Sequence, residues 1–76
     1  MEIHQIRYFL AVAEKGNFTK ASQQCAVSQP SLSIQVAKLE NELGGALFER
    51  SRQGSRLTRR GELFLPRARD ILRQYR

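Results

Sequence analysis

The chain has 76 residues, and its 13 lysines and arginines against 7 aspartates and glutamates give a formal net charge of +6 at pH 7. This length allows one small domain, and a single cysteine with a single histidine excludes an internal disulfide and a zinc site. No apolar run approaches the roughly 20 residues that span a bilayer, and the start MEIHQIRYF lacks the pattern of a signal peptide. We therefore expect an intracellular protein.

The charge is distributed unevenly along the chain. Residues 1–49 carry four lysines and arginines against five glutamates, a net charge of −1, whereas residues 50–76 carry nine arginines against two acids, a net charge of +7. Arginine makes forked contacts with phosphate and guanine. A clustered basic segment in a domain with a pI near 10.5 indicates nucleic-acid binding, with a membrane surface as the alternative partner.

The first predicted helix covers residues 3–15 and ends at Gly16. Its inward stripe is expected to contain Ile3, Ile6, Phe9 or Leu10, and Ala13. Tyr8 and Val12 lie off that stripe, so the helix is expected to be apolar on more than one side.

A second, short helix is predicted to begin at Asn17-Phe18-Thr19, with Asn17 or Thr19 as its N-cap. Cys25 shares its inward face, which favours a small buried thiol over a redox sensor. Only Ala26 and Val27 separate this helix from the next, so the connection is a sharp turn. Two helices joined in this way form a helix-turn-helix.

Residues 28–43 are predicted to form the recognition helix of this pair. Ser28 is the expected N-cap, Pro30 fits the first turn, and Gly44 ends the helix. One apolar stripe consists of Leu32, Val36, Leu39 and Leu43. The opposite face is short-chained and uncharged at its tip, and it contains Gln29, Pro30, Ser31, Ser33, Ile34, Ala37, Lys38 and Asn41. Such a face fits a DNA major groove, and a merely solvated helix face is the alternative.

A small hairpin, or wing, is predicted after Gly44-Gly45. The strand-like runs LFERS and SRLT flank residues 52–55, where Gln53-Gly54 supplies the turn, and Leu47, Phe48 and Leu57 supply inward contacts. The wing carries Arg50, Arg52 and Arg56, which could reach phosphates or the minor groove. The alternative interpretation is that these arginines only keep an exposed edge strand soluble and do not bind DNA.

The last predicted helix follows Thr58 as its cap and reads RRGELFLPRARDILRQYR. Pro66 is expected either to bend it near residues 62–65 or to mark its effective start. Its apolar rows contain Phe64, Leu65, Ala68, Ile71, Leu72 and Tyr75. This is more apolar surface than one thin domain covers, so we expect the helix to pack against a second copy and the chain to be the front of a longer protein.

Three segments together resemble the N-terminal domain of LysR-type transcriptional regulators: IRYFLAVAEKGNFTKAS, VSQPSLSIQVAKLENELGGALFER and RLTRRGELFLPRARDIL. The resemblance implies a mostly α winged helix-turn-helix with a two-stranded wing over residues 1–58. It implies a linker helix over residues 59–76 that pairs antiparallel in a homodimer. It also implies a separate C-terminal domain that binds a small effector, and tetramers of the full-length protein. Such a protein would act in the bacterial cytoplasm and bind interrupted inverted repeats in double-stranded promoter DNA.

The resemblance also implies that Gln29, Pro30, Ser31 and Ser33 face bases and that Thr19 and the wing arginines lie near phosphates. The full set of expected DNA contacts is Thr19, Lys20, Ser28, Gln29, Pro30, Ser31, Ser33, Ile34, Gln35, Lys38, Arg50, Arg52 and Arg56. The chain departs from the family where Ile34 replaces a frequent arginine and Cys25 a common leucine. Arg59-Arg60 replaces a less charged pair, which is expected to strengthen binding to the DNA backbone.

Two other classes of function fit the sequence less well. A membrane-surface or partner-binding helix would need only residues 59–76, and it would leave the sharp turn, the capped third helix and the wing unexplained. An enzyme is not expected, because no histidine is placed to activate Ser28, Ser31 or Ser33, and neither paired carboxylates nor a glycine-rich phosphate loop occurs. No cofactor or metal is expected for these residues.

Overall fold

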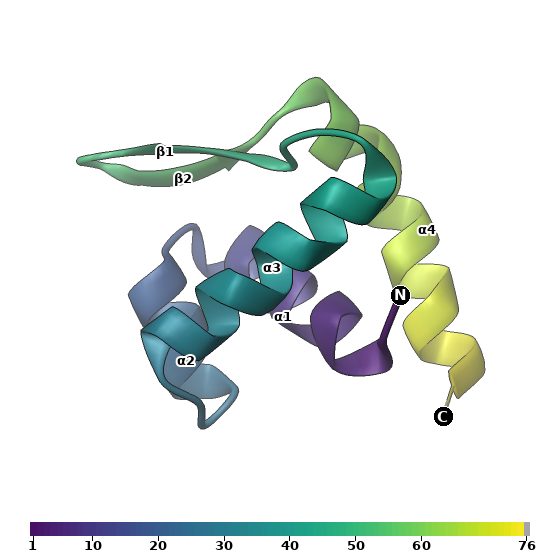
Figure 1. Ribbon diagram of the computed structural model, residues 1–76, viewed down its shortest axis with the longest axis horizontal. Helices are drawn as coiled ribbons and strands as arrows, with labels where there is room; N and C mark the ends of the chain where they lie inside the picture. Colours follow the sequence, from purple (N-terminus) through teal and green to yellow (C-terminus); the bar gives the residue numbers. More distant parts are fainter. Residues whose placement is uncertain (76) are drawn as a thin grey trace.

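Three helices, a two-stranded hairpin and a fourth, longer helix follow one another in the computed structural model, which describes residues 1–75 (Figure 1). Their bounds are α1 Ile3–Lys15, α2 Phe18–Gln24, α3 Gln29–Leu43, β1 Phe48–Ser51, β2 Gly54–Leu57 and α4 Arg59–Tyr75. The predicted order of elements, three helices, a hairpin and a helix, is confirmed.

Local capping chemistry sets most of the helix ends. The Asn17 side chain accepts from the Lys20 N–H at 2.8 Å, so Asn17 rather than Thr19 caps α2. Ser28 Oγ accepts from the Ser31 N–H at 3.2 Å, and Thr58 Oγ1 accepts from the Gly61 N–H at 3.0 Å. Gly44 ends α3 in the left-handed conformation with φ +87°. The predicted caps of α3 and α4 are therefore confirmed.

The core forms around α1, which contacts α2, α3 and α4. Its fully buried side chains include Ile6, Phe9 and Val12, whereas Ile3, Leu10 and Ala13 are only half-buried. Of the two predicted alternatives, Phe9 rather than Leu10 is the fully buried one, and the buried Val12 confirms that the helix is apolar on more than one side. The reason is that other helices cover α1 from several sides, so it buries a wider face than one stripe.

The connection between α2 and α3 is the sharp turn that the sequence predicts. Ala26 adopts φ +59°, and the Val27 N–H donates to the Ser22 carbonyl at 3.0 Å. On the inner side of α3, Leu32, Val36 and Leu39 are fully buried. The two helices therefore form a helix-turn-helix whose second helix packs with one face on α1 and α2.

The wing is an antiparallel hairpin in which Phe48 pairs with Leu57 and Ser51 pairs with Gly54. The turn therefore consists of residues 52 and 53, and the expectation that Gly54 shares the turn with Gln53 is corrected, because Gly54 pairs with Ser51 in the strand. Next to Gly54, the Ser55 N–H donates to the Gly16 carbonyl at 2.9 Å. A side chain at Gly54 would collide with that carbonyl oxygen, so glycine is required there.

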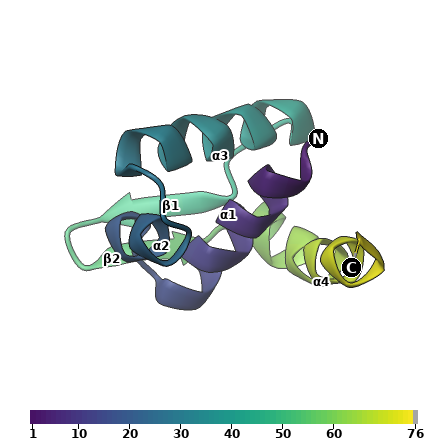
Figure 2. The ribbon, with the colours of Figure 1, turned by 90° about the horizontal axis from the view of Figure 1, so that it is seen from below.

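Helix α4 runs without interruption across Pro66. Pro66 is therefore not the effective start of the helix, and that alternative is wrong. Figure 2 shows α4 and α3 on different sides of α1. Within the described residues, no helix is long and apolar enough to cross a membrane.

Candidate nucleic-acid interface

One face of α3 remains free of contacts with the rest of the protein. Pro30, Ser31, Ile34, Ala37, Lys38 and Asn41 are exposed, and the Ile34 side chain has 56% of its surface accessible. These residues alternate with the buried Leu32, Val36 and Leu39 at helical spacing. The helix therefore presents a polar, short-chained face outward while its apolar face holds it to the domain.

The hydroxyl and amide groups at the start of α3 are arranged by hydrogen bonds to one another. Ser28 Oγ donates to Ser31 Oγ at 2.9 Å and accepts from the Ser31 N–H. One turn further along, Gln29 Nε2 donates to Ser33 Oγ at 2.6 Å. The predicted base-facing residues Gln29, Ser31 and Ser33 are thus brought together at one end of the helix.

Arg50 joins the wing to this end of α3. Its guanidinium carbon lies 3.5 Å from the centre of the Phe18 ring in α2, and its Nη2 donates to Ser33 Oγ at 3.3 Å. Phe18 in turn packs edge-on against Phe48 of β1, with ring centres 5.6 Å apart. Arg50 is therefore not a free wing cation, which the sequence spacing did not indicate.

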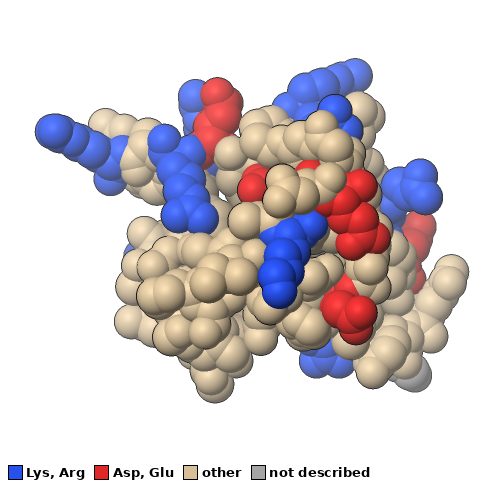
Figure 3. All heavy atoms as spheres, viewed as in Figure 1, with Lys and Arg blue, Asp and Glu red and all other residues tan. Residues whose placement is uncertain are grey.

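The other predicted cations surround the same region. Lys20 at the start of α2 and Arg52 and Arg56 on the wing are exposed, as is Thr19. Figure 3 shows lysine and arginine side chains projecting from the wing above a largely uncharged surface, with acidic side chains gathered toward the other side of the view. A polyanion approaching this surface would meet positive charge beside the uncharged tip of α3.

Gln35 lies at the edge of this face, and its role as a DNA contact stays a prediction. Its Oε1 accepts from Gln5 Nε2 at 3.1 Å and lies 3.1 Å from His4 Nε2. Both partners are in α1, so the Gln35 side chain lies on the flank of α3 that faces α1. The buried Gln5 amide needs this partner, because an unpaired polar group in the core is costly.

Arg60 serves the fold rather than the wing. Its Nη1 donates to the Leu43 carbonyl at 2.7 Å, and its side chain lies so close over Gly45 that a Cβ there would be 2.6 Å from Nε. A cation at the C-terminus of a helix satisfies an otherwise unpaired carbonyl and complements the helix dipole. Arg60 therefore has a capping role, and the expectation that Arg59-Arg60 strengthens backbone binding stays a prediction.

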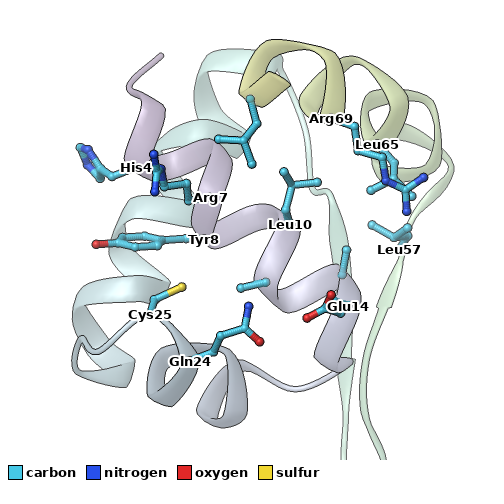
Figure 4. Close-up of a pocket in the computed structure, with 13 residues that line it drawn as sticks. His4, Arg7, Tyr8, Leu10, Glu14, Gln24, Cys25, Leu57, Leu65 and Arg69 are labelled. Atoms are coloured by element: carbon cyan, nitrogen blue, oxygen red, sulfur yellow. The ribbon is translucent and has the colours of Figure 1, made fainter. Parts of the chain in front are cut away.

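A hollow of about 840 Å³ opens between α1, α2 and α4 (Figure 4). Leu10, Leu65, Leu72 and Cys25 are among the residues that line it. Cys25 is only half-buried, which corrects the expectation of a buried thiol. Burial still raises the pKa of the Cys25 thiol, and the nearby Arg7 guanidinium lowers it to a smaller extent. A raised pKa disfavours the reactive thiolate.

The apolar rows of α4 divide between the core and the surface. Phe64 and Ala68 are buried in the chain's own core, where the Phe64 ring packs 5.1 Å from Phe9. Neither can line an interface with a second copy, and their prediction as interface residues is corrected. Of the remaining residues, Ile71 and Tyr75 are exposed and Leu65 and Leu72 are half-buried.

Helix α2, the sharp turn and α3, followed by the β1–β2 hairpin, define a winged helix-turn-helix protein. Residues 3–62 match the model of the family described as bacterial regulatory helix-turn-helix protein, lysR family. The chain belongs to this LysR family.

Named relatives and solved structures agree with this assignment. The chain is similar to the HTH-type transcriptional regulator TfdT of Cupriavidus pinatubonensis (strain JMP 134 / LMG 1197), with 49% identity over 72 residues that cover 95% of this chain and 32% of TfdT. It is 41% identical over 76 residues to the HTH-type transcriptional regulator BsdA of Bacillus subtilis (strain 168), covering 99% of this chain and 26% of BsdA. The chain therefore spans about a third or less of these regulators.

Two similar structures were solved with DNA. The crystal structure of the CbnR_DBD–DNA complex matches with a TM-score of 0.94 and 47% identity, covering 99% of this chain and 86% of that one. The BenM_DBD/benA site 1 DNA complex matches with a TM-score of 0.91 and 40% identity, covering 99% and 84%. The fold shared with these two is the winged helix-turn-helix.

Proposed function

We propose that the chain is the DNA-binding part of a bacterial transcription regulator and acts on double-stranded promoter DNA in the cytoplasm. The observation that carries this proposal is the free outward face of α3, whose polar tip lies directly beside the arginine-bearing wing. A helix of this width fits the major groove, and wing arginines suit phosphates or the minor groove. Similar domains solved in complex with DNA support DNA as the partner.

The contacts divide into two groups by chemistry. We assign base contacts to the tip of α3, where Gln29, Pro30, Ser31, Ser33 and Ile34 lie. Backbone contacts are assigned to the exposed polar and basic residues around it: Thr19, Lys20, Ser28, Lys38, Arg52 and Arg56. The first group would set sequence preference and the second general affinity.

A homodimer through α4 completes the proposal. Ile71 and Tyr75 expose apolar surface, and the half-buried Leu65 and Leu72 add to it. Residues 1–58 would carry the DNA contacts, and residues 59–76 would link two copies. Phe64 and Ala68 pack this linker helix against the core of its own chain. For the full-length protein we propose a C-terminal effector domain and tetramers, in line with the short share of the relatives that this chain spans.

Selection of bound sequences from a random duplex pool tests the function directly. We expect an interrupted inverted repeat, because a symmetric dimer places one α3 on each half-site. With about six phosphates contacted, the logarithm of the binding constant should fall with the logarithm of salt concentration at a slope near −5. Recovery of no shared sequence, or preference for anionic vesicles over duplex in a direct competition, would reject the proposal.

A further inference from the structure

The hydrogen bonds around Ser33 restrict what its hydroxyl can offer to a ligand. A serine hydroxyl has one hydrogen to donate and two lone pairs that accept. Gln29 Nε2 donates to Ser33 Oγ at 2.6 Å, and Arg50 Nη2 donates to the same atom at 3.3 Å. Both lone pairs are therefore engaged, and a guanidinium group can only donate.

The hydroxyl hydrogen of Ser33 has no acceptor of its own within residues 1–75. The hydrogen bonds that involve Ser33 Oγ in this part of the chain are the two that it accepts. Ser33 is also only half-buried, on the flank of α3 next to the wing. The hydrogen is thus available to an acceptor that comes from outside the protein.

Arg50 is positioned by its contact with the face of the Phe18 ring. The guanidinium carbon is 3.5 Å from the ring centre, which is the distance of a stacked pair. The Phe18 ring projects from α2 and packs in turn against Phe48 of β1. A lysine at this position would keep the charge but lose the planar stack and the forked donor.

We infer that Arg50 is a positioning residue that makes Ser33 a donor-only reader of base edges in the major groove. A free serine can contact either donors or acceptors on a base. With both lone pairs engaged, Ser33 would select the acceptors, namely purine N7, guanine O6 or thymine O4, over the amino groups of adenine and cytosine. This inference rests on the proposed function and adds the chemistry of one contact and the residue that controls it.

The test uses the duplex obtained by selection and a set of base analogues that each delete one acceptor, purine N7, guanine O6 or thymine O4. Binding is measured by fluorescence anisotropy for the wild type and for Ser33→Ala, Arg50→Lys and Arg52→Lys. We expect one acceptor deletion per half-site to weaken wild-type binding about fivefold, as loss of a single hydrogen bond does. The same deletion should have no effect on Ser33→Ala.

The two lysine variants separate positioning from charge. Arg50→Lys should retain the wild-type dependence on salt but lose the penalty that the wild type shows when the contacted guanine O6 or thymine O4 is replaced by an amino group, because the freed lone pair of Ser33 can then accept. Arg52→Lys, on the exposed wing, should keep that penalty. Thermal unfolding checks that each variant is folded, and Arg50→Gln, which lacks the charge, serves as a second substitution if Arg50→Lys is unstable.

The outcomes distinguish the inference from the function on which it rests. The inference is overturned, while the function stands, in either of two cases. In the first, the wild type recognises the selected duplex but every acceptor deletion weakens Ser33→Ala as much as the wild type. In the second, Arg50→Lys keeps the full wild-type penalty for the amino replacement. If no preferred duplex emerges from the pool, the proposed function fails first.

Discussion

The Glu40 carboxylate accepts a hydrogen bond from the Leu47 N–H at 2.7 Å and a longer one, at 3.4 Å, from the Phe48 N–H. Glu40 lies near the end of α3, and Leu47 and Phe48 lead into the wing. One side chain thus holds the first strand of the wing against the recognition helix. The wing and the helix are presented as a single surface for this reason.

Loss of this carboxylate should destabilise the domain. We expect Glu40→Ala to lower the free energy of unfolding by about 1.5–3 kcal/mol, because buried backbone donors lose a charged partner. Chemical denaturation followed by circular dichroism measures the change. Glu49→Ala, an exposed acid on β1, is the matched control and should stay within about 0.5 kcal/mol of the wild type.

Removal of the Gln29 amide should reduce discrimination between sequences. Gln29→Ala is expected to lower the preference for the selected duplex over a scrambled one by about 1–3 kcal/mol, the range of a good base contact. Competition binding measures the preference. Asn41→Ala, on the outward face at the other end of α3, should keep the preference of the wild type. Equal losses on both duplexes in Gln29→Ala would mean that Gln29 does not contact bases.

The exposed wing arginine should act without regard to sequence. Arg52→Ala is expected to weaken binding to all duplexes similarly and to reduce the salt slope by about 1, because one phosphate contact is lost. Titrations at several salt concentrations give the slope. A slope that stays at the wild-type value would exclude Arg52 from the backbone contacts.

A charge in the apolar row of α4 should separate the two copies. Leu72→Asp is expected to yield monomers in analytical ultracentrifugation, because burying an unpaired carboxylate opposes association. Gln74→Asp adds the same charge to an exposed polar position of the same helix and should leave the dimer intact. Dimers that persist in Leu72→Asp would reject this interface.

The Cys25 thiol should react slowly with alkylating reagents. Burial raises its pKa above the ordinary value of 9.0, so the folded protein keeps the thiol proton to higher pH than the unfolded chain does. Its contribution to stability is therefore present below pH 9.0 and disappears as the pH rises through the folded-state pKa. The rate of alkylation by iodoacetamide should show its inflection above that value, and the protein unfolded in urea should show it near 9.0. An inflection below 9.0 in the folded protein would contradict this.

The parts of the fold that could be predicted from the sequence depend on neighbouring residues. Ser28, Gly44 and Thr58 act within one turn of their own positions, so their capping roles are visible in the sequence. Helical periodicity likewise shows which face of α3 is apolar. The sequence therefore predicts the order of the elements and the outward face of the recognition helix.

The remaining features depend on contacts between distant parts of the chain. Arg50 meets Ser33 across 17 residues, and Gln35 meets Gln5 across 30. Spacing along one helix cannot show which flank faces a neighbouring helix, so the sequence does not reveal the contact between Gln35 and Gln5. In the same way, the wide apolar surface of α4 did not show that Phe64 and Ala68 are covered by the core.

The hairpin is fastened to the helices at both of its ends: near its turn, the Ser55 N–H donates to the Gly16 carbonyl at 2.9 Å, and at its base the Leu47 N–H donates to the Glu40 carboxylate at 2.7 Å. A hairpin held in this way has little freedom to move relative to the helices. In the proposed complex, a rigid wing would require the DNA duplex to deform to fit it. We would then expect a preference for easily kinked pyrimidine–purine steps between the contacted segments, at base pairs that no side chain touches.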